Sequence, residues 1–122
     1  MAQEIPVTYV PARNSIFLSL AVSYAEARDA EAIFIGANAL DYSGYPDCRP
    51  EYFQAFSEVI RRGTKAGTQG KIIGIEAPLL KLSKKEIVEL GASLGVPFEK
   101  TWSCYQGRDR SEERRVGKEC RL

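Results

Sequence analysis

The chain has 122 residues, 44% hydrophobic side chains and a net charge of +1, which fits one globular domain without general attraction to nucleic acid or membranes. It contains no histidine, which excludes Ser-His-Asp and Cys-His catalysis and histidine metal sites unless another chain supplies the imidazole. Its three cysteines, Cys48, Cys104 and Cys120, make neither a disulfide framework nor a complete zinc site.

The first two predicted elements are a strand and a helix. Residues 4–10 are rich in β-branched and aromatic side chains and predict the strand, and residues 15–28 predict the helix. Asn14 or Ser15 is expected to cap this helix. Apolar residues surround it, so we expect it to be largely buried; those at the helical spacing are Phe17, Leu20, Ala21 and Tyr24.

The middle of the chain contains a short apolar run, a polar loop and a second helix. The run over residues 32–36 is typical of a central parallel strand that is covered on both faces. The loop over residues 38–49 contains Gly and Pro, and the helix over residues 50–62 begins at a proline. Since long loops are usually binding loops or disordered, and its aromatic residues need burial, we favour an ordered binding loop over a plain connector.

A third strand and a third helix follow. Residues 71–77 predict the strand, and Ser83 with Glu86 has the spacing of a capping box at the start of the helix. The alternation of strands and helices predicts an α/β fold, with a three-layer, Rossmann-like parallel sheet and right-handed crossovers. Residues 108–122 are mostly charged and predict a tail without a core.

Ligands of an open parallel sheet bind beyond the carboxyl ends of its strands, so the loops that follow the three strands are expected to line one site. These loops span residues 11–14, 38–49 and 78–84. Together they offer guanidinium and ammonium groups, carboxylates and a thiol. Their convergence on one edge of the sheet is stronger evidence for a site than any one of them.

Several of these residues have two interpretations. Arg13 and Asn14 fit an anion site at a helix start, or a capping Asn beside a solvated Arg. Lys84 is either a phosphate contact or a solvated surface lysine. Cys48 is a nucleophile without an adjacent base, or a small buried thiol. Cys104 is an ordinary buried cysteine or one ligand of an incomplete metal site.

Four segments carry a resemblance to a known family. VPARNSIFLSLAVSYAEA, AIFIGANALDYSGYPDCRPEYFQAF, APLLKLSKKEIVELG and TWSCYQG together resemble the 7-cyano-7-deazaguanine synthases of queuosine biosynthesis. That family belongs to the N-type ATP pyrophosphatases, the PP-loop group with the adenine nucleotide alpha hydrolase-like fold. The resemblance covers residues 4–107, and DYSGYPDCRPE is its most specific part.

The resemblance implies an ATP-dependent C–N ligase that converts 7-carboxy-7-deazaguanine and ammonia to 7-cyano-7-deazaguanine. It implies ATP and Mg²⁺ at the reaction centre, a structural Zn²⁺ and small-molecule substrates. Arg13 and Lys84 become the candidate catalytic residues. The candidates for holding substrate or ATP are Asn14, Asn38, Asp41, Tyr42, Ser43, Asp47, Cys48 and Arg49.

The lack of a secretory signal pattern and the unpatterned cysteines predict a cytoplasmic location. The net charge of +1 and the lack of a long apolar run predict no direct contact with nucleic acid or membrane, and the oligomeric state stays open, with a homodimer as one option.

The chain departs from the family pattern at both ends. The family's Ser-Gly-Gly-x-Asp-Ser phosphate loop is absent, and of the four zinc cysteines only Cys104 has a match. We therefore interpret residues 1–107 as the C-terminal portion of a PP-loop domain, incomplete at its N-terminus. Residues 108–122 resemble translated sequencing adapter. We expect such a fragment to be marginally stable and inactive by itself.

Two other functions stay open from the residues. One is a non-catalytic α/β module that uses the 38–49 loop to hold a purine-like ligand or a protein. The other is a different amide-forming PP-loop enzyme, such as a relative of tRNA thiolases or NAD synthetases. The DYSGYPDCR segment speaks against this second alternative.

Overall fold

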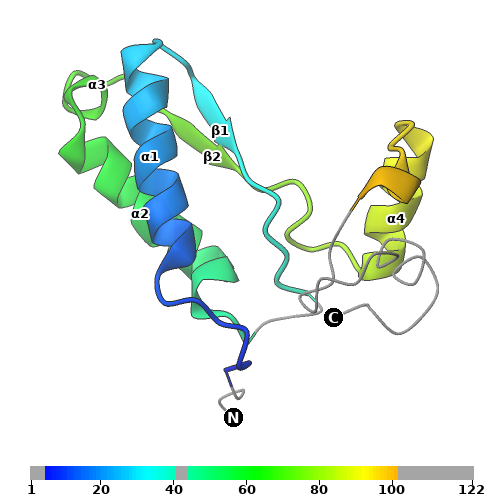
Figure 1. Cartoon of the computed structure of the whole chain (residues 1–122). Helices are drawn as coiled ribbons and strands as arrows, with labels where there is room; N and C mark the ends of the chain where they lie inside the picture. The colour runs from blue at the N-terminus through cyan, green and yellow to red at the C-terminus, as the bar shows by residue number, and fades with distance from the viewer. Residues whose placement is uncertain (1–4, 41–43, 102–122) are drawn as a thin grey trace. The chain divides into compact units, whose positions relative to one another are not determined.

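The computed structural model describes residues 5–40 and 44–101, which fall into two compact units divided between Lys84 and Lys85. The first unit carries both strands, and the second carries most of the last α-helix. In chain order the helices, strands and 3-10 turns are α1 (Arg13–Ala27), β1 (Ala32–Phe34), η1 (Pro46–Cys48), α2 (Pro50–Gly63), α3 (Lys65–Thr68), β2 (Gly74–Glu76), α4 (Lys84–Ser93) and η2 (Phe98–Lys100) (Figure 1).

The two strands form a parallel pair, as their sequences predicted, although each is shorter than expected. Ile33 lies opposite Ile75, and the backbone N–H of Ile35 donates to the carbonyl of Glu76 at 2.9 Å beyond the strand end. The connection between the strands contains α2 and α3. A parallel pair needs such a long crossover, because a tight turn can join only antiparallel strands.

The core lies between this strand pair and the two long helices. One buried cluster joins Val22 of α1 to Ile60 of α2, and a second joins Leu18 of α1 to Phe53 of α2. Ile33 packs against both clusters. Because the same strand side chain meets both helices, α1 and α2 cover the same face of the pair.

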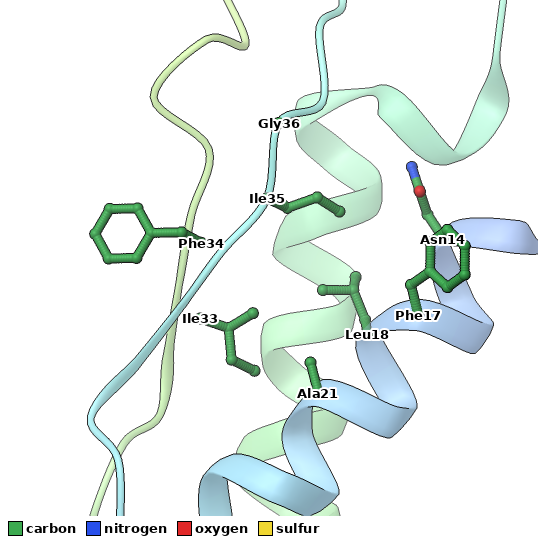
Figure 2. Close-up of a pocket in the computed structure, with 8 residues that line it drawn as sticks. All are labelled: Asn14, Phe17, Leu18, Ala21, Ile33, Phe34, Ile35 and Gly36. Atoms are coloured by element: carbon green, nitrogen blue, oxygen red, sulfur yellow. The ribbon is translucent and has the colours of Figure 1, made fainter. Parts of the chain in front are cut away.

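The opposite face of the pair differs from the prediction of a strand covered on both sides. Phe34 is 73% exposed, and it points away from the helices while Ile33 and Ile35 point toward them (Figure 2). Within the first unit, the described helices therefore form one layer on one side of the strands. The mixed α/β class and the small parallel sheet agree with the prediction, whereas the three-layer, Rossmann-like sheet stays a prediction.

The α1 helix confirms the predicted helix, but the expectation that it is largely buried was wrong. Its buried stripe is Leu18, Val22 and Ala25, at the spacing of one helix face. The neighbouring side chains of Leu20 and Tyr24 are each 67% exposed. Apolar residues occupy most faces of this helix, and only the face with Leu18, Val22 and Ala25 packs in the core.

The start of α1 also corrects two predictions. Residues 5–10 form no strand: the carbonyl of Pro6 accepts a hydrogen bond from the N–H of Tyr9 at 3.0 Å, which makes a turn. Pro6 itself has no N–H to donate to a ladder. Neither Asn14 nor Ser15 caps α1, because the capping position is Ala12, which has a left-handed backbone (φ 55°) and no side-chain cap.

The α2 helix matches its prediction closely, and the segment that follows it contains the short helix α3. Thr64 caps α3 through its hydroxyl oxygen, which accepts from the N–H of Gly67 at 2.9 Å. Glu26 of α1 accepts from the N–H of Ala66 at 2.7 Å and ties this corner to α1. A methyl group on Gly67 would clash with the carbonyl oxygens at the end of α2, those of Ile60 and Arg61.

The second unit begins within the third predicted helix, which the structure confirms as α4, starting directly after Ser83. The helix ends at a turn in which Gly95 has a positive φ of 79°, and the N–H of Val96 donates to the carbonyl of Gly91 at 2.9 Å. The ring of Phe98 then packs over Gly91. None of the described helices is long and apolar enough to cross a membrane.

Candidate functional site

The candidate site lies at the carboxyl ends of the two strands, where the loop over residues 38–49 joins two other segments. One end of the loop is held by the segment after β2, and the other end is held by the first turn of α1. The sequence predicted that these three segments converge, and their hydrogen bonds bring them together.

Asn38 anchors the first end of the loop. Its side-chain amide donates to the carbonyls of Leu79 at 2.8 Å and of Leu82 at 2.6 Å. The backbone N–H of Ala39 adds a third bond, to the carbonyl of Leu80 at 2.9 Å. Since a carbonyl in a loop needs a donor when it is removed from water, Asn38 stabilises the segment that leads into α4.

Asp47 and Asn14 anchor the second end of the loop. Asp47 is only 9% exposed, and its carboxylate Oδ2 accepts from the backbone N–H of Asn14 at 3.0 Å. The Asn14 side-chain amide donates in return to the Asp47 carbonyl at 2.7 Å and to the Cys48 sulfur at 3.5 Å. The carboxylate therefore satisfies an N–H in the first turn of α1, the role a capping side chain usually has.

Two pairs of hydroxyl groups reinforce this second anchor, and our sequence analysis did not identify their roles. The Ser15 and Tyr52 hydroxyls lie 2.7 Å apart, and the Thr8 hydroxyl contacts that of Tyr45. A tyrosine packed against apolar neighbours needs a partner for its hydroxyl, which was the available signal for Tyr45 and Tyr52. It did not reveal which serine or threonine supplies the partner.

The titration of Cys48 favours the interpretation as a small buried thiol. Burial raises the pKa of this thiol and the nearby carboxylate of Asp47 raises it further, while the Asn14 hydrogen bond and the charge of Arg13 lower it. Burial also raises the pKa of the Tyr52 hydroxyl, against the effect of its bond with Ser15. At neutral pH both groups keep their protons, so Cys48 lacks the thiolate that a nucleophile needs.

The three candidate cations each stand at the start of a helix and are half-buried. Arg13 is the first residue of α1, Arg49 is the residue before α2, and Lys84 is the first residue of α4. A cation at the positive end of a helix is unfavourable by itself, and an anion placed nearby removes that cost. All three side chains have interaction partners in the structure.

A pocket of about 290 Å³ lies between α1 and β1, beside the second anchor (Figure 2). Asn14 supplies a polar side chain at one end, and the other lining side chains are apolar. The residues that line it are Asn14, Phe17, Leu18, Ala21, Ile33, Phe34, Ile35 and Gly36.

The remaining predicted site residues, Asp41, Tyr42, Ser43 and Cys104, lie outside the described residues. In the part of the chain that is described, no three Cys, Asp or Glu side chains gather in a group that could hold a metal ion. The zinc site implied by Cys104 and the magnesium site thus stay predictions.

Comparison with known proteins gives a consistent result. The family model described as queuosine biosynthesis protein QueC matches residues 1–122. A 7-cyano-7-deazaguanine synthase of Nostoc punctiforme is 65% identical over 109 residues, which cover 89% of this chain and 49% of that protein. Synthases of the same name from Trichodesmium erythraeum and Thermoplasma acidophilum are 61% and 58% identical, over 90% and 89% of this chain and 50% and 45% of those proteins. The chain thus spans about half the length of these curated relatives.

Proposed function

This chain belongs to the queuosine biosynthesis protein QueC family, and we propose that it contributes the substrate loop of a 7-cyano-7-deazaguanine synthase. The observation that carries the proposal is the loop over residues 38–49, which contains most of the most specific family segment, residues 41–51. Its two ends are anchored, at Asn38 and at Asp47, to segments that carry candidate cations. A loop held at both ends can present its polar side chains to a ligand at little entropic cost.

The proposed reaction activates the carboxylate of 7-carboxy-7-deazaguanine with ATP. A carboxylate oxygen attacks the α-phosphorus and pyrophosphate leaves. Ammonia then attacks the acyl carbon, and AMP departs with that oxygen to leave an amide and a proton. A second ATP activates the amide oxygen in the same way, with loss of pyrophosphate, and loss of AMP and of both N–H protons gives the nitrile.

In this scheme Arg13 and Lys84 stabilise the negative charge that develops on the phosphates, because a guanidinium and an ammonium are the side chains suited to that task. Asn14, Asn38, Cys48 and Arg49, with the loop residues Asp41, Tyr42 and Ser43, hold or enclose the substrate, and Asp47 anchors the end of their loop on α1. Mg²⁺ bound with ATP supplies further charge neutralisation. Since the described carboxylates form no metal cluster, we assign no residue of the chain to it.

The test uses a hybrid enzyme in which the 109 matched residues of the Nostoc punctiforme synthase are replaced by those of this chain. The hybrid receives ATP, ammonia and 7-carboxy-7-deazaguanine with ¹⁸O in its carboxylate, and products are identified by mass spectrometry. We expect the nitrile, with ¹⁸O in AMP. We also expect no product from this chain by itself.

Two results would count against the proposal. If ¹⁸O is found in inorganic phosphate, the carboxylate is phosphorylated and the adenylation step is wrong. If the hybrid is folded but gives no nitrile while the unmodified synthase is active, the matched residues do not support the reaction.

A further inference from the structure

The first turn of α1 depends on a side chain from a distant part of the sequence. The helix begins after Ala12, which has no side chain able to cap it. The acceptor for the N–H of Asn14 is the Asp47 carboxylate, from a residue 33 positions later. A substitution at Asp47 therefore acts on the start of α1 as well as on its own loop.

The contact is reciprocal and has neighbours on both sides. Asn14 donates to the Asp47 carbonyl and to the Cys48 sulfur, and the pairs Thr8–Tyr45 and Ser15–Tyr52 flank it. These bonds all join residues 8–15 to residues 45–52, so we call the set the α1 latch. Linked hydrogen bonds of this kind strengthen one another, and loss of a buried member affects the others.

The Asp47 carboxylate is directed at the protein's own backbone. One of its oxygens is taken by the helix N–H, and the residue is 9% exposed. An anionic group of a substrate or of ATP would also be repelled by this carboxylate at close range. Both points argue against Asp47 as a group that binds the phosphates of ATP.

We propose that Asp47 is a positioning residue, which fixes residues 44–49 on the first turn of α1 through the α1 latch and does not itself touch substrate. The inference deepens the proposed function and rests on it for the statement about substrate. The placement of the loop can be measured without any ligand.

The ligand-free test follows the reactivity of Cys48, whose sulfur accepts a bond within the latch. The full chain carries Cys104→Ser and Cys120→Ser so that Cys48 is its single thiol, and the rate of disulfide exchange with an aromatic disulfide is measured against pH. The high-pH plateau reports access to the sulfur, and the midpoint reports its pKa. Asp47→Ala, Asp47→Asn and Glu26→Ala are compared.

Asp47→Ala removes the acceptor and is expected to raise the plateau about 5- to 30-fold, the change in open population that corresponds to the loss of one helix cap. Asp47→Asn keeps an oxygen acceptor, so its plateau is expected to stay within about 2-fold of the unsubstituted value. Both variants lower the midpoint, since both remove the charge that raises the Cys48 pKa. Glu26→Ala, at the far end of α1, removes a carboxylate that accepts from the backbone N–H of Ala66 in α3, and it should change neither value.

Two results would overturn the latch. An unchanged plateau in Asp47→Ala means that the carboxylate does not hold the loop. An equal rise in Glu26→Ala means that any lost carboxylate loosens the whole unit, and that the effect is not local.

The same substitutions in the hybrid enzyme test the statement about substrate. In Asp47→Ala, only those molecules whose residues 44–49 remain fixed on α1 can bind substrate. The KM for 7-carboxy-7-deazaguanine should therefore rise by the reciprocal of their fraction, and Asp47→Asn should keep the KM near the unsubstituted value. If Asp47→Asn loses as much as Asp47→Ala, the carboxylate binds substrate directly and the positioning role is wrong. If the latch results hold but the hybrid makes no nitrile, the proposed function fails and the latch stands.

Discussion

The side of α1 that packs on the strands can be tested with two leucines of the same helix. Leu18 is 1% exposed and lies in the cluster with Ala37 and Phe53, whereas Leu20 is 67% exposed. Both residues lie well inside α1, so Leu18→Ala and Leu20→Ala change helix propensity by similar amounts. A difference between the two variants therefore measures tertiary packing.

The expected difference follows from the buried volume that is lost. Leu→Ala removes three carbon groups, which at about 0.8 kcal/mol each accounts for about 2.4 kcal/mol of transfer free energy. The cavity that remains adds to this, so Leu18→Ala should reduce the free energy of unfolding by about 2–5 kcal/mol. Leu20→Ala has little to lose and should change it by less than about 0.5 kcal/mol.

The assay is urea unfolding of the full chain and the two variants, followed by circular dichroism in the helix region at several protein concentrations. The midpoint for Leu18→Ala should fall sharply while that for Leu20→Ala stays near the unsubstituted value. Equal losses in the two variants that are independent of concentration would refute the assigned face of α1. A loss of stability in Leu20→Ala that grows with protein concentration would show that a second copy of the chain covers the face of α1 that carries Leu20.

Three further predictions concern the α2 corner, Cys48 and the start of α4. Gly67→Ala places a methyl group against the backbone of α2 and should reduce the free energy of unfolding by about 1–3 kcal/mol. Gly63→Ala has nothing within 4 Å of the added carbon and should raise the free energy of unfolding by about 0.4–1 kcal/mol. Thermal unfolding compares the two variants. Because burial raises the pKa of the Cys48 thiol, its contribution to stability is complete below the usual thiol pKa of about 8.5 and is lost as pH rises through the higher folded pKa. Between these two pKa values the urea midpoint of the unsubstituted chain should fall more steeply than that of Cys48→Ser, and parallel curves in that range would show that burial does not affect this thiol. In the hybrid enzyme, Lys84→Met should reduce kcat/KM for ATP at least about 10-fold, because one charged contact is lost. Lys85→Met changes the exposed neighbour and should leave kcat/KM unchanged. Similar losses in both variants would indicate only a general effect of surface charge.

The sequence predicted the α2 helix and the strand pairing well, for reasons that are local. The α2 helix has a proline in its first turn and a one-sided apolar face, with Phe53 and Ile60 buried. The face of α1 could not be predicted in the same way. More than one apolar stripe runs along that helix. Helical spacing alone selected the stripe with Leu20 and Tyr24, whereas packing on the strands buries the stripe with Leu18.

The candidate site shows a similar limit. Asn14, Asn38 and Asp47 were recognised because polar residues that follow strands are typical of binding sites. Their partners are backbone groups and side chains 33 to 44 positions away, which residue types alone do not specify. The strand predicted over residues 4–10 failed because β-branched residues indicate a preference for a pleated surface, and a strand also needs a neighbour with which to pair.

The most direct test of the account is a crystal structure of the hybrid enzyme with 7-carboxy-7-deazaguanine and a non-hydrolysable ATP analogue. The account predicts the deazaguanine ring against the loop over residues 38–49, the phosphates beside Arg13 and Lys84, and the Asp47 carboxylate still bonded to the N–H of Asn14. Both ligands bound far from this loop and from the start of α1 would contradict it.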